Sequence, residues 1–250
     1  MGQLEGRTSV VTGGSTGIGL ATAVRLADEG AYVFVTGRRK TELDAAVAAV
    51  GPDRATGVAG DVSEAADLDR LYEAVRARGR GLDVVVANAG TAAFVTLEQT
   101  TEEHLDQTFA VNVRGTLLTV QKALPLLNDG ASVVLIGSTA ADRGMEAFGA
   151  YAASKAAVRS FARTWSNELK GRGIRVNAVS PGMVETPGNT AVVGGEEAMR
   201  GVREAAATMV AKGRMGRPEE VAAAVAFLAS EQSSYLVGAN IYVDGGVNQI

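Results

Sequence analysis

The chain has 250 residues, 46% of them hydrophobic and 5% aromatic, so it can bury a large core as one domain or two small ones. Its formal net charge of -4 gives no electrostatic grip on nucleic-acid phosphates, and we expect no nucleic-acid partner. The absence of cysteine excludes disulfides and thiolate metal sites, and the single histidine, His104, argues against any metal centre. No apolar run approaches the roughly 18 residues of a membrane span, and the N-terminus lacks the apolar core of a signal peptide. We therefore expect a cytoplasmic protein with no membrane partner.

Short β-branched runs alternate with longer amphipathic segments along the chain, with no linker or repeat between them. The predicted strands are Thr8–Thr12, Tyr32–Thr36, Ala55–Val58, Leu82–Ala87, Ala131–Ile136, Arg175–Val179 and Asn240–Val243. Several are nearly continuous apolar runs, which is typical of strands covered on both faces. The pattern predicts an α/β protein with a parallel sheet between two helix layers.

Two long helices are predicted on either side of the fifth strand. Their apolar residues at helical spacing are Leu105, Phe109, Val113, Leu117, Val120 and Leu124 in the first helix and Val158, Phe161, Trp165 and Leu169 in the second. We expect both rows to be buried faces. Farther on, Gly, Pro and Thr interrupt the helical pattern of residues 183–213, which predicts a mobile excursion above the sheet.

Three glycines, Gly13, Gly17 and Gly19, follow the first strand and open a helix predicted to run to about Glu29. The first N–H groups of such a helix have no partner within it and point toward the edge of the sheet. Glycine lets an anion such as a pyrophosphate approach the backbone, and the helix dipole favours its charge. The spacing is not the usual GxGxxG, so a glycine-rich turn that binds nothing remains an alternative at this point.

A second signal is the sequence YAASK, in which Tyr151 and Lys155 lie four residues apart on one helix face. Ser138 ends the fifth strand at the sheet edge from which this helix starts, where doubly wound folds bind ligands. Asn112 is a polar residue within an otherwise apolar helical row. Taken separately, the Tyr–Lys pair fits a solvated helix face and Asn112 fits a core amide.

Eight motifs occur together in one order: TGGSTGIG, GDV, ANAG, Asn112 in FAVNVRG, Ser138, YAASK, SPGMVET and VDGG. With these motifs the whole chain resembles the short-chain dehydrogenase/reductase family, in its branch of about 250 residues. The resemblance implies a Rossmann-type doubly wound sheet of about seven strands flanked by helices on both faces. It also implies that residues 1–250 form a single domain with a variable substrate-covering segment at about 183–213. Ala87 departs from the pattern, since the family often has a second Asn there.

The resemblance further implies a site for a nicotinamide dinucleotide. The residues it places against that cofactor are Gly13, Ser15, Ile18, Gly19, Arg38, Asp61, Val62, Asn88, Ala89, Gly90, Tyr151, Lys155, Pro181, Gly182, Val184 and Thr186. Without the resemblance, Asp61 fits the N-cap of a helix beginning near Ser63, and Thr186 fits a loop hydroxyl. The implied catalytic tetrad is Asn112, Ser138, Tyr151 and Lys155.

These residue types suit the interconversion of an alcohol and a carbonyl in a small molecule. Tyr151 is the expected general acid or base, Ser138 the hydrogen-bond partner of the substrate oxygen, and Asn112 the anchor of a water that links Lys155 to solvent. We expect the Lys155 ammonium to lower the pKa of the phenol by about two units. Arg143, Glu146 and Phe148 either line the substrate pocket or only shape a loop.

Two other functions fit the motifs: an epimerase or dehydratase that uses the cofactor transiently, and a cofactor-binding sensor without turnover. Relatives of the first kind usually carry a larger C-terminal region. Enoyl reduction is disfavoured because the related enoyl reductases space Tyr and Lys more widely.

The position at which NAD-specific relatives place an acidic residue is Gly37, and Arg38 follows it, so we expect NADP(H) to be preferred over NAD(H). Thr16 stands where NADP-binding relatives often have a second basic residue. The resemblance also implies a homotetramer.

Overall fold

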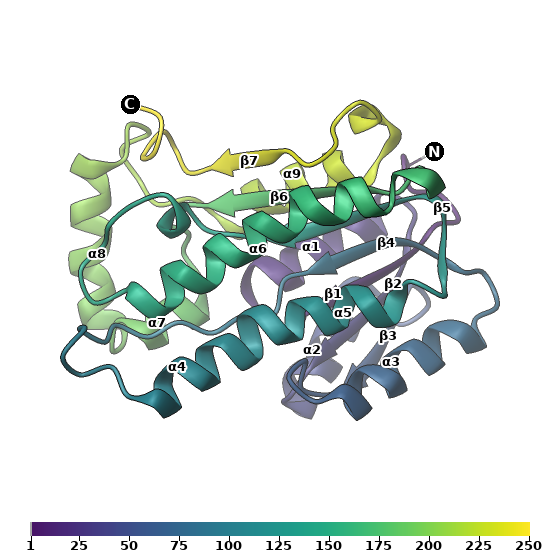
Figure 1. The fold of residues 1–250 in the computed structure, drawn as a ribbon, viewed down its shortest axis with the longest axis horizontal. Coiled ribbons are helices and arrows are strands. Elements are labelled where there is room, and N and C mark those ends of the chain that lie inside the picture. The colour runs from purple at the N-terminus through teal and green to yellow at the C-terminus, as the bar shows by residue number, and fades with distance from the viewer. Residues whose placement is uncertain (1) are drawn as a thin grey trace.

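The computed structural model describes residues 2–250, in which seven strands form one parallel sheet (Figure 1). The strands are β1 (Thr8–Thr12), β2 (Tyr32–Gly37), β3 (Ala55–Ala59), β4 (Leu82–Ala87), β5 (Leu127–Ile136), β6 (Arg175–Pro181) and β7 (Asn240–Val243). Their order across the sheet is β3-β2-β1-β4-β5-β6-β7, and each neighbouring pair is parallel. The predicted α/β fold with a doubly wound sheet is confirmed.

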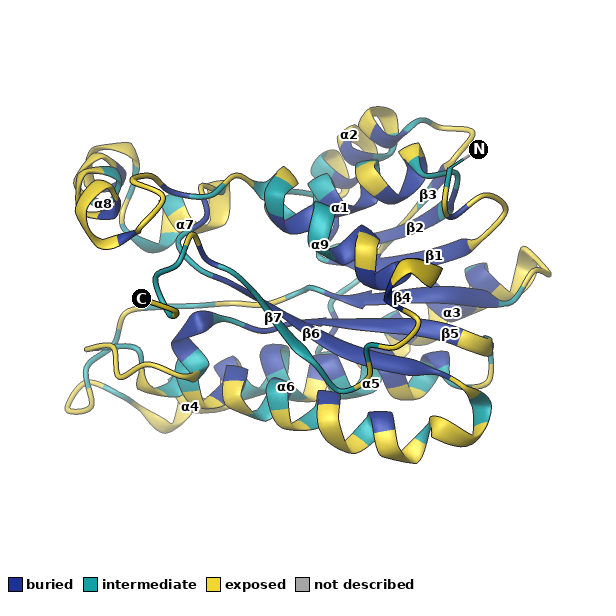
Figure 2. Ribbon diagram, turned by 90° about the horizontal axis from the view of Figure 1, so that it is seen from above, coloured by how far each residue is buried: buried dark blue, intermediate teal, exposed yellow. Residues whose placement is uncertain are grey.

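Helices cover both faces of the sheet (Figure 2). The helices are α1 (Gly17–Asp28), α2 (Lys40–Val50), α3 (Ala65–Ala77), α4 (Glu102–Phe109), α5 (Gly115–Ala123), α6 (Gly149–Glu168), α7 (Pro187–Val192), α8 (Glu196–Met209) and α9 (Pro218–Ala229). Helices α1, α2 and α9 pack on one face, while α3, α5 and α6 pack on the other. The strands therefore lie between two apolar layers, as their continuous apolar sequences predict.

Alternate residues of each strand enter opposite cores because side chains in a strand point to opposite faces in turn. On β1, Val11 packs with the α1 layer and Val10 with the α3 layer. On β5, Val134 and Val133 divide in the same way. These strand residues, which face the two cores, are wholly buried. A slip of one residue along a strand would turn each side chain to the opposite core, so this packing fixes the register of the sheet.

The strand order reverses between β1 and β4, which are neighbours in the sheet although β2 and β3 lie between them in the chain. The connection after β1 runs to α1 on one face, and the connection after β4 runs to α4 and α5 on the other. Two loops therefore separate at the carboxyl edge of the sheet and leave a crevice there. Ligands of open α/β sheets bind at this kind of reversal.

The helix predicted between the fourth and fifth strands is divided by a π-helical turn at Ala110–Arg114, which separates α4 from α5. The predicted buried row is also wrong for most of this segment. The residues that are buried are Thr108, Asn112, Gly115, Thr116, Thr119, Val120 and Ala123. Leu105 is 42% exposed, and Phe109, Val113 and Leu117 are only partly buried. The closely packed inner face takes small and polar side chains, and the larger apolar ones lie outside it.

Residues 183–213 form two helices, α7 and α8, beyond the carboxyl edge of the sheet (Figure 2). Gly194 and Gly195 separate them, with φ angles of 95° and 116° that favour glycine. Met199 and Ala206 of α8 are buried in a small cluster with Val210 and Met215. The segment thus has a core of its own, apart from the two sheet layers.

A buried arginine joins β6 to the end of α9. The Arg175 guanidinium donates hydrogen bonds to the carbonyl oxygens of Leu228, Ser230 and Ser233 over distances of 3.0, 3.1 and 3.2 Å. It also donates to Ser233 Oγ at 2.7 Å, and Arg175 is only 7% exposed. Leu228 lies in the last turn of α9, where carbonyls lack intrahelical donors, and Ser230 and Ser233 follow that turn.

We expect Arg175→Met to lower the free energy of unfolding by about 3 kcal/mol, because it removes the buried hydrogen bonds of a charged group that join β6 to the end of α9. The matched control is Arg76→Met, whose 58% exposed side chain makes one ion pair with Glu73. The control should change stability by less than about 0.5 kcal/mol. Urea unfolding of both variants measures the difference, and equal effects would contradict this role for Arg175.

Candidate active site

A single cleft at the carboxyl edge of the sheet contains nearly every predicted site residue. The predicted residues that line it are Gly13, Ser15, Ile18, Gly19, Arg38, Asp61, Val62, Asn88, Ala89, Gly90, Ser138, Tyr151, Lys155, Pro181, Gly182, Val184 and Thr186. Asn112 is the exception, since it lies behind the cleft wall and is wholly buried. Residues separated by more than 150 positions therefore meet at the strand reversal.

The turn between β1 and α1 is built to face an anion. Thr16 caps α1 without a side-chain hydrogen bond, and the first turn of the helix carries no acidic residue. Gly13 and Gly17 have φ angles of 61° and 55°, and a Cβ on Gly17 would lie 3.3 Å from the Thr186 side chain. The first N–H groups of α1 therefore have no capping side chain at the cleft wall. Free N–H donors at a helix N-terminus are the groups that bind a phosphate.

The side chain of Asn88 holds this turn in place. Its Nδ2 atom donates to the carbonyl oxygens of Thr12 and Gly13 at 2.8 and 3.1 Å, and its backbone N–H donates to Thr12 Oγ1 at 3.1 Å. A Cβ on Gly19 would lie 2.5 Å from Asn88 Nδ2 and 2.2 Å from Gly13 O. Asn88 therefore ties β4 to the glycine turn, a structural task that the sequence did not reveal.

Asp61 shapes the turn that follows β3. Its Oδ1 atom accepts hydrogen bonds from the backbone N–H and the hydroxyl of Ser63, at 2.9 and 2.8 Å. Helix α3 begins only at Ala65 with Glu64 as its N-cap, so the alternative that made Asp61 a helix N-cap is wrong. The carboxylate instead closes a two-residue turn at the lip of the cleft.

Arg38 reaches the same lip from the end of β2. Its Nη1 atom lies 3.8 Å from Asp61 Oδ2, and 73% of its side chain is exposed. A Cβ on Gly37 would lie 2.8 Å from Ser15 Oγ, so a carboxylate side chain at that position requires Ser15 to move. The lip therefore carries an exposed cation, Arg38, next to a position at which an acidic side chain would be crowded.

Tyr151 and Lys155 lie in the first two turns of α6, with Lys155 Nζ 5.8 Å from the centre of the Tyr151 ring. The ammonium donates to Ile136 O at 2.8 Å. Lys155 is 5% exposed, and this burial lowers its pKa to about 8.

Burial also raises the pKa of the Tyr151 phenol, while a hydrogen bond with the Ser138 side chain opposes part of that rise. The expected lowering of the Tyr151 pKa by Lys155 is therefore wrong for the chain by itself. Two physical reasons account for the difference: the ammonium is directed at the Ile136 carbonyl, and desolvation of the phenolate outweighs its attraction to the charge.

Asn112 connects three parts of the site from within the core. Its Oδ1 accepts from Thr91 N at 2.8 Å, and its Nδ2 donates to Thr91 O and to Ser154 Oγ, each at 2.9 Å. The Ser154 hydroxyl then donates to Tyr151 O at 2.6 Å. A Cβ on Gly90 would lie 3.4 Å from Asn112 Oδ1 and 3.5 Å from Lys155 Nζ, so the amide and the ammonium flank the same glycine.

Thr186 also has a local task in the structure. Its Oγ1 accepts a hydrogen bond from Asn189 N at 3.1 Å and caps the first turn of α7, while the residue lines the cleft. Of the three residues left open between Ser138 and Tyr151, Arg143 donates to Val247 O at 3.3 Å. Phe148 instead packs on the Tyr151 ring, with 4.5 Å between ring centres.

Several residues of the site escaped the sequence analysis. Those without a predicted role are Thr12, Thr91 and Ser154, which complete the hydrogen-bond network, and Phe94, which stacks on Phe148. A hydroxyl within a motif, for Thr12 and Ser154, or directly after one, for Thr91, was the only signal for the first three. Phe94 stands in a loop without periodicity, so its sequence position indicated nothing.

Comparison with known proteins identifies the family. A family model described as enoyl-(acyl carrier protein) reductase matches residues 13–248. The chain is 46% identical to oxidoreductase asL5 of Sarocladium schorii, over 99% of this chain and 98% of that protein. It is 38% identical to the 3-oxoacyl-[acyl-carrier-protein] reductase FabG of Thermotoga maritima, over 98% and 99% of the two chains. Among solved structures, levodione reductase superposes with a TM-score of 0.92 at 32% identity and covers 98% of each chain.

The chain therefore belongs to the short-chain dehydrogenase/reductase family of oxidoreductases. Its sheet order and its cleft at the strand reversal are those of a Rossmann-type fold. Within residues 2–250, none of the helices is long and apolar enough to cross a membrane.

Replacing Lys155 with Met should change how stability depends on pH. Below about pH 8 the wild type keeps a buried charge in the folded state, and this charge costs stability. Between pH 8 and 10.5 the folded state releases its proton while the unfolded chain retains one, so the stability of the wild type rises with pH. Relative to Lys155→Met, the wild type should gain about 2 kcal/mol between about pH 7 and pH 9.5.

Urea unfolding at these two pH values measures the difference. Lys170→Met is the matched control, because Lys170 is exposed and its Nζ contacts only the Asn167 side chain, at 2.9 Å. The control should show no such gain. If the difference in stability between the wild type and Lys155→Met were the same at both pH values, the burial of a charged ammonium would be contradicted.

Proposed function

We propose that the protein interconverts an alcohol and a carbonyl in a small molecule, with a nicotinamide dinucleotide as cofactor and residues 1–250 as one cofactor-binding and catalytic domain. The observation that carries the proposal is the meeting of Tyr151, Ser138 and Lys155 in the cleft that also contains the glycine turn. A proton donor and an anion site therefore share one cavity at the strand reversal. Membership of an oxidoreductase family supports the same reaction class.

The lining of the cleft suits the cofactor at four places. The uncapped start of α1 suits the pyrophosphate, the turn at Asp61 and Val62 suits the adenine, and the strip from Pro181 to Thr186 suits the nicotinamide. Asn88 to Gly90 would lie along the ribose. When bound, the nicotinamide supplies or accepts the hydride.

The residues of the chain handle the proton and the substrate oxygen. Tyr151 would donate a proton to the carbonyl oxygen during reduction, or remove it from the hydroxyl during oxidation, and Ser138 would hold the same oxygen by a hydrogen bond. Burial raises the pKa of Tyr151 and keeps the phenol protonated, which favours the acid role. Lys155 would hold the ribose hydroxyls, and Asn112 would anchor a water that leads from Lys155 to solvent.

Two alternative functions predict different behaviour. A cofactor-binding sensor would bind the dinucleotide and turn over no carbonyl, although Tyr151, Ser138 and Lys155 all line its cleft. An epimerase or dehydratase would convert its substrate with no net change in cofactor. Monitoring net cofactor oxidation in the presence of carbonyl compounds separates both from the proposed activity.

We also propose that NADP(H) is preferred over NAD(H). Arg38 is 73% exposed at the cleft lip, and Gly37 offers no carboxylate to repel a 2′-phosphate. A guanidinium can bind such a phosphate with two parallel hydrogen bonds. The ion pair with Asp61 is long at 3.8 Å, so a phosphate can displace it at small cost.

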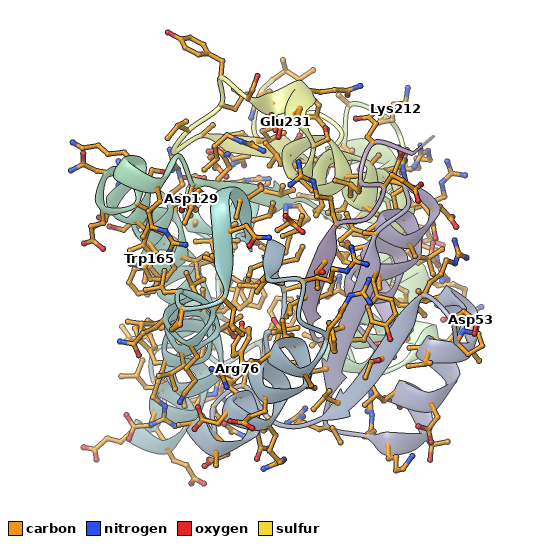
Figure 3. All side chains as sticks on the ribbon, turned by 90° about the vertical axis from the view of Figure 1, so that its right-hand side faces the viewer. Asp53, Arg76, Asp129, Trp165, Lys212 and Glu231 are labelled. Atoms are coloured by element: carbon orange, nitrogen blue, oxygen red, sulfur yellow. The ribbon has the colours of Figure 1, made fainter. Side chains whose placement is uncertain are left out.

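A homotetramer is the proposed assembly. The outer sides of α4 to α6 carry the partly exposed residues Leu105, Phe109 and Trp165, and Trp165 stacks on Phe161 with ring centres 4.4 Å apart. Figure 3 shows Trp165 at the margin of the molecule, on the side of α6. Near the C-terminal segment, Tyr235 is 100% exposed. Both apolar areas suit subunit contacts.

The cytoplasmic location stays a prediction.

The central test is Tyr151→Phe. The variant keeps the aromatic ring but loses the proton, so kcat for carbonyl reduction should fall at least about a hundredfold while cofactor affinity stays within about twofold. Tyr72→Phe is the matched control. The Tyr72 hydroxyl is buried, lies outside the cleft and donates a hydrogen bond of 2.5 Å to Thr119 O. Tyr72→Phe should keep the kcat of the wild type. Near-normal turnover by Tyr151→Phe would remove Tyr151 from the acid role.

A second experiment tests the cofactor preference. The wild type should use NADPH about thirtyfold more efficiently than NADH in kcat/KM, the scale of one charge-assisted contact, and Arg38→Ala should lose most of this ratio. Lys40→Ala is the control, because Lys40 pairs with Asp44 at 2.7 Å and does not line the cleft. Equal or better use of NADH by the wild type, or an unchanged ratio in Arg38→Ala, would disprove the preference.

A further inference from the structure

Three aromatic rings form a row that leads from the surface to the phenol of Tyr151. Phe94 stacks on Phe148 with 4.6 Å between ring centres and 15° between planes. Phe148 in turn packs on Tyr151 with 4.5 Å between centres and a tilt of 39°. Phe94 is 49% exposed, so the outer end of the row is open to solvent. The row comes from two separate segments, the loop after β4 and the start of α6.

The backbone holds this row in a strained conformation. Ala147 has a φ of 59° and is the only non-glycine residue with positive φ in the described part of the chain. Its carbonyl accepts a hydrogen bond from Val95 N at 2.7 Å, which joins the two segments beside the stacked rings. A non-glycine residue in this region costs free energy that the surrounding contacts must offset, and such strain is concentrated at functional sites.

Apart from the Lys155 ammonium beside Tyr151, the charges of the cleft lie away from this row. Of the ionisable residues that line the cleft, Arg38, Arg39 and Asp61 stand beyond the ends of β2 and β3. Only Tyr151 and Lys155 stand at the catalytic end. The other cleft residues there are uncharged and include Thr91, Ala92, Gln107, Val111, Ala191 and Val192.

The two segments that carry the row also expose apolar side chains. Leu97, three residues after Phe94, is 93% exposed, and Met145, three residues before Phe148, is 43% exposed. Exposed apolar surface on the segments that carry the row favours an apolar ligand, since its burial removes both surfaces from water. A flat ring gains additional contact with an exposed aromatic side chain.

From these observations we propose that Phe94 is a specificity residue and that the substrate is an uncharged ketone, or the matching secondary alcohol, with a flat apolar ring next to its carbonyl carbon. The inference rests on the proposed function. During reduction the carbonyl carbon receives the hydride of the reduced nicotinamide nucleotide, the C=O π bond breaks, and the oxygen takes the proton of Tyr151. The ring of the substrate lies along the aromatic row while this happens.

Three ketones test the substrate class: acetophenone, which has the ring, butan-2-one, which lacks it, and 4-acetylbenzoate, which adds a charge. With NADPH or NADH, whichever the wild type uses better, kcat/KM for acetophenone should exceed that for each of the others by at least about tenfold. Phe94→Ala should lower the acetophenone value by about tenfold through KM and leave the butan-2-one value unchanged.

Phe227→Ala is the matched control, since Phe227 is a 36% exposed phenylalanine on α9, away from the cleft. It should change none of the three values, and thermal unfolding should show that both variants fold. Equal losses for acetophenone and butan-2-one in Phe94→Ala would overturn the role of Phe94. A wild-type preference for 4-acetylbenzoate or butan-2-one would overturn the substrate class while leaving the proposed function intact. If the wild type turned over none of the three ketones and no other carbonyl compound, both the substrate class and the proposed function would be overturned.

Discussion

The site depends on one buried side-chain amide. Asn112 uses its oxygen and both N–H groups inside the core, where an unpaired polar atom would cost about 1 to 3 kcal/mol, so its partners Thr91 and Ser154 are fixed relative to each other. Ser154 extends the network to the backbone of Tyr151. Asn112 lies in a π-helical turn, and such turns occur frequently at functional sites. One amide thus joins the loop after β4 to the first turns of α6.

The position of α6 then determines the chemistry at the sheet edge. Lys155 enters a layer of apolar side chains because its Nζ finds Ile136 O, and burial makes its proton easier to lose. Burial acts on Tyr151 in the opposite sense and makes its proton harder to lose. On the other side of the strand reversal, Asn88 holds the glycine turn through Thr12 and Gly13. Two amides of the connection between β4 and β5, Asn88 at its start and Asn112 in the π-helical turn, therefore position the anion site and the proton site in a single cleft.

Much of this architecture follows from the sequence, because strands buried on both faces read as apolar runs and glycine turns read as turns. All seven predicted strands form, and only the fifth begins earlier than predicted, at Leu127. The buried face of α4 and α5 could not be predicted from apolar periodicity, since close packing there selects small and polar residues such as Thr108 and Thr116. The pKa of Tyr151 depends on desolvation and on where an ammonium points, and spacing along a helix gives neither. Phe94 meets Phe148 only through tertiary contact, so no local pattern indicated it.

The most direct measurement of the central claim compares kcat for carbonyl reduction in Ser154→Ala and Ser166→Ala. Both hydroxyls are buried on α6 and donate to a carbonyl, at 2.6 Å to Tyr151 O and at 2.7 Å to Val176 O, so each variant should lose about 1 kcal/mol of stability. Only Ser154 also accepts from Asn112. We predict that Ser154→Ala lowers kcat about tenfold, the loss expected when a catalytic group is slightly misplaced, while Ser166→Ala keeps the value of the wild type. Equal values of kcat in the two variants would contradict the claim that the Asn112 network positions Tyr151.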